Sequence, residues 1–285
     1  MPDARPATVD DLAALVPDGA SLTLNKGDEA DAPMALVLAL IRRGVRGLHV
    51  VTLPTCAYPA SGMAVDLLIG AGCVRSVETS GISLHELGAA PRFSQAVKRG
   101  ELQVLDATCP AVYAGLQAGA KGQPFAPLRG LIGSDLQRHR ADYKIIQNPF
   151  ADGEDPIVLI PAINTDAALF HAAQADAEGN VWVGRDRDRV LAAHAADTVL
   201  VTVEERVPGN FFADEAMAAG TIPAECITAL AVVPGGCWPM DPTGRTDLDA
   251  VRAYQRAAAS EEGFAEHLAA LQARFGAGQP AMAEA

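Results

Sequence analysis

Residues 18–33 read DGASLTLNKGDEADAP and contain a strand, a loop and the start of a helix, in that order. The run Ser21–Leu24 follows the turn residues Pro17-Asp18-Gly19, which predicts a strand that begins just after a turn. The loop Asn25–Ala32 then leads to Pro33, which suits the first position of a helix because its missing N–H would have no partner there. The stretch therefore predicts the first strand-to-helix step of an α/β fold.

The same alternation continues on both sides of this stretch. Helices are expected at 9–16, 33–43, 63–69, 91–99, 111–120 and 189–195, with a long helical region at 247–274. Strands are expected at 48–53, 74–77, 102–105, 157–160, 167–171, 181–183, 199–203 and 227–233, and the polar stretch 138–155 is expected to be a loop. Strands that alternate with helices predict the α/β class, with an open, largely parallel sheet and helices on both faces.

The chain offers no clear point at which to divide it into domains. It has 285 residues, no repeat of solenoid length and no low-complexity linker. A chain of this length buries roughly three-quarters of its unfolded surface, which is close to the upper limit for one domain. We expect a single α/β domain over residues 1–275, followed by a flexible tail over residues 276–285.

The charge balance excludes several classes of function. The chain has 35 acidic and 22 basic residues, for a formal net charge of −13. Such a surface repels phosphate backbones and acidic lipids, so we expect neither nucleic acid nor a membrane as a partner. The apolar runs are too short to cross a bilayer, and the start of the sequence lacks a signal-peptide pattern. The five cysteines form no C-x-x-C pair and are typical of reduced thiols, so the expected location is the cytoplasm.

Common cofactor and metal motifs are missing from the sequence. Gly70-Ala71-Gly72 begins a dinucleotide-binding pattern, but Arg75 occupies the third glycine position. The sequence contains no G-x-x-x-x-G-K-[ST], no H-E-x-x-H and no G-x-S-x-G. None of the six histidines pairs with another histidine or a cysteine at metal-ligand spacing. We therefore expect no metal site and no permanently bound cofactor.

Residues 18–33 also resemble the first sequence signature of the family I coenzyme A transferases. That signature runs Asp-Gly, two free residues, three apolar residues, Gly-Gly-Phe, three free residues, Gly, one free residue and Pro. The matching residues are Asp18, Gly19, Leu22, Leu24 and Pro33. The departures are Thr23 in the apolar triplet, Asn25-Lys26-Gly27 in place of Gly-Gly-Phe, and Asp31 in place of the later glycine.

Further segments, spread from Thr8 to Pro239, resemble the A chain of glutaconate CoA-transferase-type enzymes. Their order and spacing carry the resemblance more than any single motif does. The segments are 62–72, 115–127, 131–135, 148–150, 169–181, 201–205 and 220–223.

The resemblance implies covalent chemistry that this chain does not complete alone. In this family a glutamate attacks an acyl-CoA thioester and becomes a glutamyl-CoA thioester, from which an incoming acid takes the CoA. That glutamate lies in a Ser-Glu-Asn-Gly motif of the B half, and this motif is absent here. The resemblance thus implies the A (alpha) half of a CoA-transferase, a transferase of sulfur-containing groups, acting with a B half in a heterodimer or heterotetramer. Its substrates would be an acyl-CoA and a carboxylic acid, with coenzyme A as a substrate and no catalytic residue in this chain.

Asn25-Lys26-Gly27 occupies the position of the family's Gly-Gly-Phe loop, which implies a place beside the substrate. Lys26 can pair with a substrate carboxylate and Asn25 can donate to a carbonyl, although an exposed loop lysine is an equal alternative. Other candidates for binding substrate or CoA lie in two glycine-bearing loops, which more often serve only as turns or helix caps, and in the basic loop Arg138-His139-Arg140. They are Thr79, Ser80, Gly81, Gly133, Ser134, Arg138 and Arg140. The charge of the basic loop is less self-neutralised than that of residues 185–189, so we expect it to be the better anion site. The loop Thr79-Ser80-Gly81 is favoured as a binding site because it follows a strand, and ligands of open α/β sheets bind beyond the carboxyl ends of the strands.

Three further features have simpler interpretations. Cys109 follows a strand, as nucleophiles often do, but we expect a small buried thiol. Arg185–Arg189 alternates arginine with aspartate and is expected to be a solvated face, with a phosphate grip as the second interpretation. Glu204-Glu205 ends a strand, and we expect structural hydrogen bonds there.

Two other functions compete with CoA transfer. The first is hydrolysis of a CoA thioester, or ring opening on one, as in related two-chain proteins of steroid catabolism that use a glutamate of the A half. The corresponding turn here, Asp106-Ala107-Thr108-Cys109, has no glutamate. The second is an effector-sensing domain like those of sugar-phosphate-responsive regulators, but the α/β pattern begins without room for a DNA-binding segment.

Overall fold

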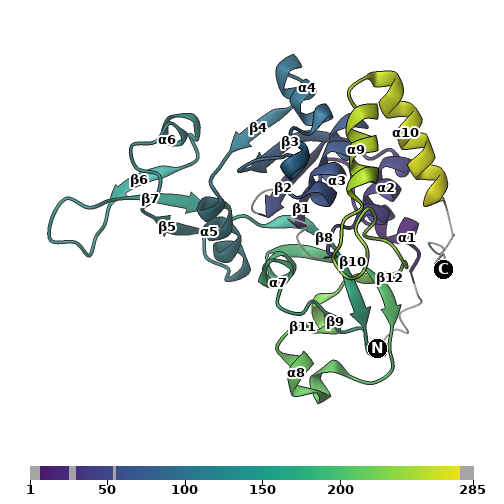
Figure 1. Cartoon of the computed structure of the whole chain (residues 1–285). Coiled ribbons are helices and arrows are strands. Elements are labelled where there is room, and N and C mark those ends of the chain that lie inside the picture. The colour runs from purple at the N-terminus through teal and green to yellow at the C-terminus, as the bar shows by residue number, and fades with distance from the viewer. Residues whose placement is uncertain (1–6, 26–29, 54–55, 277–285) are drawn as a thin grey trace.

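The structure, a computed structural model, describes residues 7–25, 30–53 and 56–276. Within these residues, seven parallel strands form the main sheet (Figure 1). In spatial order they are β12 (Ala229–Val232), β10 (Ala196–Arg206), β8 (Thr165–Ala175), β1 (Ser21–Asn25), β2 (Leu48–Leu53), β3 (Val74–Thr79) and β4 (Gln103–Asp106). A short antiparallel extension, β9 (Val181–Trp182) with β11 (Thr221–Ile222), continues from the end of β8. The open, largely parallel sheet predicted from the sequence is confirmed.

Helices cover both faces of the main sheet. Those on one face are α1 (Val9–Ala14), α2 (Met34–Arg43), α3 (Pro59–Gly70), α4 (Pro91–Arg99), α9 (Leu248–Ala257) and α10 (Glu261–Arg274), and those on the other are α5 (Cys109–Ala120) and α7 (Arg187–His194). Strand β2 serves both cores, since Leu48 and Val50 pack on the first side while Val51 and Leu53 pack on the second. Successive side chains of a strand point to opposite faces, so an apolar strand without a polar face is buried on both sides.

The helix ends follow the local sequence signals. Thr8 and Asp11 form a capping box at the start of α1, where the sequence predicts a helix. Gly44 ends α2 and Gly100 ends α4, with φ angles of 77° and 69° in the left-handed region that glycine adopts without strain. The expected long helical region is instead two helices, because the chain leaves α9 after Ala257 and Ser260 caps the start of α10.

Residues 125–161 form a separate three-stranded antiparallel sheet that we call the arm, which extends away from the main sheet (Figure 1). Its elements are β5 (Phe125–Leu128), α6 (Leu136–His139), β6 (Lys144–Gln147) and β7 (Pro156–Pro161), paired in the order β5-β7-β6. The predicted loop over residues 138–155 is therefore wrong for β6. All four β6 residues are exposed, and the strand forms through pairing with β7. It therefore lacks the alternation of buried and exposed residues from which a strand is predicted in a sequence.

The remaining described elements are short. They are α8 (Glu215–Ala218) and the 3₁₀ turns His85–Leu87, Phe211–Ala213 and Ala224–Cys226. Among the described residues, no helix combines the length and the apolar character needed to cross a bilayer. Most of the predicted tail, from residue 277 onward, lies outside the described residues.

Candidate functional site

The chain reverses its direction of winding between strands β1 and β8. From β1 it passes through α2 to β2 and onward to β4, whereas from β8 it passes through α7 to β10 and β12 on the other side. Helices α2 and α7 pack on opposite faces of the sheet. The loops beyond the carboxyl ends of β1 and β8 thus diverge, and such a topological switch point is where open α/β sheets bind ligands.

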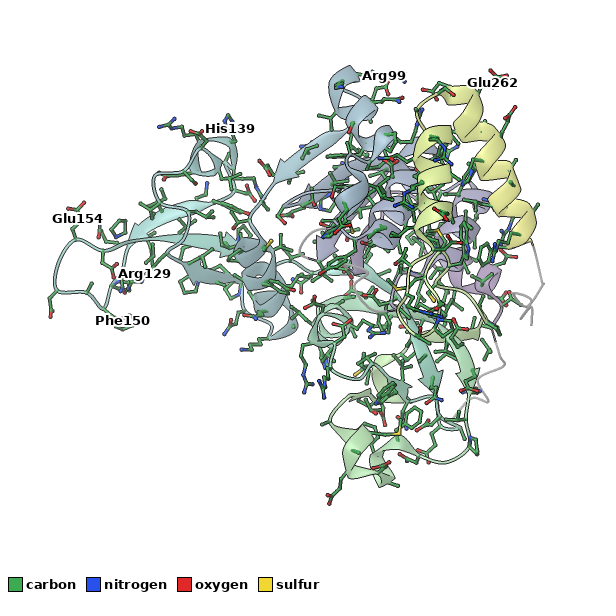
Figure 2. All side chains as sticks on the ribbon, viewed as in Figure 1. Arg99, Arg129, His139, Phe150, Glu154 and Glu262 are labelled. Atoms are coloured by element: carbon green, nitrogen blue, oxygen red, sulfur yellow. The ribbon has the colours of Figure 1, made fainter. Side chains whose placement is uncertain are left out.

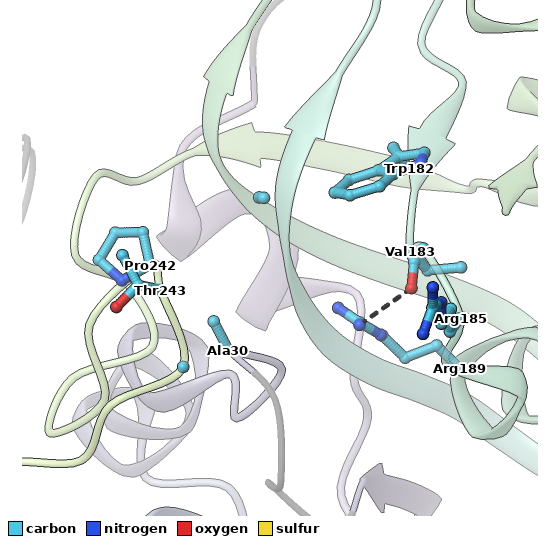
Figure 3. Close-up of a pocket in the computed structure, with 10 residues that line it drawn as sticks. Ala30, Trp182, Val183, Arg185, Arg189, Pro242 and Thr243 are labelled. Carbon is cyan, nitrogen blue, oxygen red and sulfur yellow. Dashed lines mark hydrogen bonds between the residues drawn. The ribbon is translucent and has the colours of Figure 1, made fainter. Parts of the chain in front are cut away.

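A pocket of about 470 Å³ lies at this switch point (Figure 3). Ala30 borders it from the loop after β1, and Ala173 borders it from β8. The rest of the lining comes from the end of β9 with the loop after it, the start of α7 and a loop before α9, namely 182–185, Arg189 and 242–244. The volume falls within the range of sites for small molecules.

The mixed-charge run 185–189 borders this pocket, and its two aspartates are buried while Arg185 and Arg187 are exposed. Asp186 is buried, accepts the backbone N–H groups of Asp188 and Arg189, and forms an ion pair with the Arg189 Nε at 2.8 Å. Asp188 is buried as well and accepts the hydroxyl of Tyr113 at 2.8 Å. The expected solvated face is therefore wrong for both aspartates, because each one caps or braces the fold, and only the exposed Arg185 and Arg187 fit it.

Arg189 has a structural role at the back of the pocket. Its guanidinium donates to the backbone oxygens of His171 at 3.0 Å and Val183 at 3.2 Å, the second of which is drawn in Figure 3. Only 4% of this residue is exposed. Arg189 therefore joins α7 to β8 and to the loop after β9, and it holds the wall of the pocket in place.

A buried cluster of polar side chains lies on strands β8 and β10 and on the loop after β12. His171 Nε2 lies 2.8 Å from Glu204 Oε1, and His171 Nδ1 lies 2.8 Å from Thr202 Oγ1. The second Glu204 oxygen accepts the Gly235 N–H at 2.7 Å, and the Cys237 thiol donates toward Glu204 Oε1 at 3.7 Å. The expected structural hydrogen bonding of Glu204 is confirmed by these contacts.

The charge states in this cluster follow from burial and hydrogen bonding. Burial lowers the pKa of His171 and outweighs the hydrogen bond to Glu204, so the imidazole is neutral. Burial alone would raise the pKa of Glu204, but the hydrogen bonds from His171 and Gly235 outweigh it and the pKa falls. Burial also raises the pKa of Cys237, with the Glu204 charge adding to the effect. An ionised Glu204 only accepts, so His171 Nε2 carries the proton and Nδ1 accepts from Thr202.

The same cluster places three potential metal-ligand atoms within 4.8 Å of one another, on His171, Glu204 and Cys237. His171 and Glu204 are hydrogen-bonded to each other, the Cys237 thiol has the backbone oxygen of Met240 at 3.3 Å as its nearer acceptor, and burial holds the thiol in its protonated form. A metal needs the thiolate, so the present arrangement fits a hydrogen-bonded brace better than a metal centre. The sequence scan missed this cluster because the three residues are widely separated along the chain.

The predicted loop Thr79–Gly81 lies beyond the carboxyl end of β3. The Thr79 hydroxyl is buried, accepts the Thr52 hydroxyl at 2.7 Å and also accepts the Gly81 N–H at 2.9 Å. Ser80 Oγ lies 3.1 Å from the sulfur of Cys109, at the start of α5. The structure thus brings Ser80 and Cys109 together, at the same edge of the sheet as the switch-point pocket. Cys109 is half-buried, so the expected buried thiol is wrong, because the first turn of α5 lies at the edge of the sheet and not in the core.

The other predicted site residues belong to the arm, end strand β1 or lie outside the described residues. Gly133, Ser134 and Arg138 belong to the arm, where Arg138 forms an exposed ion pair with Asp135 at 3.1 Å. Arg140 is buried and pairs with Glu78 at 2.8 Å and with Asp142 at 2.7 Å. Both arginines have countercharges close by, so the interpretation that this loop is less self-neutralised than the run 185–189 is wrong, and anion binding by it stays a prediction. Asn25 ends β1, its side chain is not described, and Lys26 and Gly27 lie outside the described residues.

Comparison with known proteins places this architecture in one family. The family model "Coenzyme A transferase" matches residues 7–227. The A chain of the 3-oxoadipate CoA-transferase of Pseudomonas knackmussii is 34% identical over 76% of this chain and 74% of its own length. The IpdA chain of the cholesterol ring-cleaving hydrolase of Rhodococcus jostii is 32% identical over 70% of this chain and 68% of its own length.

Two solved structures share the fold across nearly the whole chain. The decarboxylase AibA/AibB C56S variant superposes with a TM-score of 0.82 at 29% identity and covers 96% of this chain and 100% of that chain. Glutaconate coenzyme A-transferase from Acidaminococcus fermentans superposes with a TM-score of 0.78 at 26% identity and covers 91% of this chain and 86% of that chain. The similar proteins thus include transferases, a hydrolase and a decarboxylase.

Proposed function

The chain belongs to the coenzyme A transferase family, and from this premise we propose that it is the A half of an enzyme that moves CoA from an acyl-CoA to a carboxylic acid. The proposal rests on the similarity to the A half of 3-oxoadipate CoA-transferase over three-quarters of both chains. It is also supported by the pocket at the switch point, whose size suits the acyl part of a substrate.

In the proposed reaction, a glutamate carboxylate of the B half attacks the thioester carbonyl, the C–S bond breaks and CoA leaves as a thiolate. The thiolate then attacks the glutamyl carbonyl of the mixed anhydride, which releases the first acid as a carboxylate and leaves a glutamyl-CoA thioester. The acceptor carboxylate repeats these two steps in reverse, so that CoA leaves on the new acid and the glutamate is restored. No electron or net proton is transferred, and preorganised donors stabilise each oxyanion.

The residues of this chain favour an external nucleophile. Among the described residues, the lining of the switch-point pocket contains no Asp or Glu. Glu204 lies nearby on β10, but both of its oxygens accept hydrogen bonds, from His171 and from the Gly235 N–H. A carboxylate held in this way is less basic and is committed to bracing two strands and a loop. The attacking glutamate is therefore assigned to the B half.

The exposed surface of the arm supports the requirement for a partner. Phe150 at its tip is 95% exposed, and Figure 2 shows it next to Arg129, which pairs with Asp155. Ile145 and Ile146, which point to opposite faces of β6, are 42% and 39% exposed. Apolar side chains exposed on both faces of one thin sheet are typical of a protein contact. We assign this contact to the B half, in a heterodimer or a heterotetramer.

All five cysteines are free thiols in the structure. Unpaired cysteines are typical of reducing compartments, and on this basis we propose a cytoplasmic location.

The test uses the chain alone and the chain co-expressed with a B half that carries Ser-Glu-Asn-Gly. We expect CoA transfer only from the complex, and borohydride treatment during turnover should reduce the thioester to an alcohol on the glutamate of the B half. Mass spectrometry locates the modification. A B half with Gln in place of that glutamate is the control and should remain unmodified. Robust transfer by the isolated chain, or a modification on this chain, would contradict the proposal.

Hydrolysis of the thioester is the second candidate, because the IpdA chain of the cholesterol ring-cleaving hydrolase is 32% identical to this chain. The turn Asp106–Cys109 lacks a glutamate, which favours transfer. The two outcomes are separated by measuring free thiol with and without an acceptor acid. Transfer gives a new acyl-CoA and little net thiol, whereas hydrolysis releases thiol at the same rate without an acceptor.

A further inference from the structure

Residues 185–189 present positive charge to the switch-point pocket, although the sequence of the run is nearly neutral. The aspartates at 186 and 188 are each 8% exposed, and their carboxylates are used within the fold. The arginines at 185 and 187 are exposed. Because buried aspartates alternate with exposed arginines along this run, the negative charges lie inside the fold and the guanidinium of Arg185 lies at the pocket (Figure 3).

The three arginines of this run differ in how many of their N–H groups donate hydrogen bonds within the protein. Arg189 is held by Asp186 and by two backbone oxygens, and Arg187 donates to the backbone oxygen of Ala219 at 3.1 Å. For Arg185 the described part of the chain provides no hydrogen bond and no ion pair. A guanidinium offers five N–H donors in a fork that matches a carboxylate, and those of Arg185 are available to a ligand.

The surroundings of Arg185 favour a small organic anion. Ala30, Ala173 and Pro242 supply apolar walls, and Trp182 adds an aromatic ring to the lining (Figure 3). The lining contains no described carboxylate that would compete with an anionic ligand. The pocket of about 470 Å³ suits the acyl part of a substrate better than a whole CoA molecule. A local cation is also needed to attract an anion to a chain with a net charge of −13.

We propose that Arg185 binds the free carboxylate of the acyl group, and that the substrates of this site are dicarboxylic acids and their mono-CoA thioesters. The inference rests on the proposed function, which requires the acyl group to lie at the carboxyl edge of the sheet. One carboxylate of the substrate carries CoA and the other lies against Arg185. Because this contact is the same before and after CoA transfer, it contributes to binding and to the choice of acid rather than to the chemical step.

The test compares Arg185→Gln with wild type in the complex with the B half, using glutarate against pentanoate and succinate against butyrate as acceptor acids. We expect KM for the dicarboxylic acids to rise about tenfold or more, with little change in kcat, as lost uniform binding predicts. The monocarboxylic acids should be poor acceptors for both proteins and should show no such change. Arg185→Lys keeps a charge without the planar fork, so it should recover part of the lost affinity.

Arg187→Gln is the matched control, because Arg187 is an exposed arginine two residues away with a hydrogen bond of its own. It should leave every KM near the wild-type value, and equal melting temperatures would confirm that the variants fold. An equal loss for both classes of acid, or no loss for either, overturns the proposal. A loss with every acyl-CoA, whatever its acyl group, also overturns it and assigns Arg185 to a CoA phosphate.

Calorimetric titration of the complex with glutarate separates this inference from the proposed function. If the wild-type complex binds glutarate about tenfold more tightly than Arg185→Gln does, the Arg185 site holds even if the reaction proves to be hydrolysis. If CoA transfer is confirmed but glutarate binds the two proteins equally, the proposed function stands and the Arg185 site is wrong. Failure of the wild-type complex to bind glutarate also overturns the site.

Discussion

Two regions of the molecule each contain an arginine, but the two arginines differ in burial and pairing. One region is the junction between the arm and the main sheet, and the other is the switch-point pocket. At the junction, Arg140 is 6% exposed, pairs with Glu78 of β3 and Asp142 of the arm, and lies over the ring of Tyr143. At the pocket, Arg185 is exposed and has no partner among the described residues. A buried, fully paired arginine connects two parts of a fold, whereas an exposed arginine without a partner is available to a ligand.

Electrostatics keep the arginine at the junction charged. Burial alone would lower the pKa of Arg140, but hydrogen bonds to Asp142 and Glu78 outweigh it and raise the pKa. The bond from Arg140 in turn lowers the pKa of Asp142. Arg140 also donates to the backbone oxygen of Asp106 at 3.1 Å, so it joins two strands of the main sheet to the arm. The predictions that follow test this difference between the two regions and begin with the largest expected effect.

Arg140→Met should destabilise the protein most, because it leaves the Glu78 carboxylate buried without its partner. Removing one member of a buried ion pair costs about 3–5 kcal/mol of the free energy of unfolding, to be measured by urea denaturation. Arg138→Met is the control, since its ion pair is exposed and should change stability little. Adding Glu78→Met to Arg140→Met should restore part of the loss. Equal effects of the two arginine substitutions would contradict the structural role of Arg140.

Lys26→Met tests whether the loop after β1 supplies a second cation to the pocket. Lys26 itself lies outside the described residues, but Ala30 of the same loop lines the pocket. An ammonium that faces a substrate carboxylate in a partly desolvated site contributes about 1.5–3 kcal/mol. We expect KM for the acid substrate to rise by one to two orders of magnitude while kcat falls less. Unchanged KM values for every acid would identify Lys26 as a solvated loop residue.

The buried cluster around His171 should make stability depend on pH. Its pKa is lowered from the ordinary 6.5, so below pH 6.5 the unfolded chain takes up a proton that the folded chain excludes. The melting temperature should therefore fall as the pH decreases from about 7 toward 5. His171→Asn should reduce this slope without removing it, because burial also lowers the pKa of His49 and His267.

The exposed His139 of the arm provides the control for this slope (Figure 2). His139→Asn should leave the dependence of the melting temperature on pH as it is in the wild type. An unchanged slope in His171→Asn would show that the neutral imidazole does not account for the effect.

Cys109→Ala should have the smallest effect of the four. Its sulfur contacts Ser80 at the carboxyl edge, but the proposed chemistry uses a carboxylate of the B half. We expect a packing loss of about 1 kcal/mol in unfolding experiments and nearly full CoA transfer by the complex. Complete loss of transfer by a folded variant would instead make Cys109 a nucleophile, and the active centre would then lie at the end of β3 and not at the switch point.

Local sequence patterns were sufficient to predict most of the main sheet. The strand at 48–53 was predicted because the stretch is mostly apolar and has no acidic or basic residue to give it an exposed face, and Gly44 and Gly100 marked the ends of two helices. The arm was largely missed, because β6 is exposed along its whole length and forms through pairing with a strand that follows it. The candidate site was predicted only in outline, since the carboxyl edge was expected from the alternation but the pocket was not.

The sequence by itself determined the α/β alternation, the family and the net acidic charge, because each is read from neighbouring residues or from composition. Only the tertiary structure decided which charged groups are free. Arg140 pairs with Glu78, which lies 62 residues away in the sequence, and Glu204 pairs with His171, which lies 33 residues away. The Asp186 carboxylate turns inward only because α7 packs against the sheet. Partners that are distant in sequence leave no local pattern, so the available charge at Arg185 emerges only when the chain is folded.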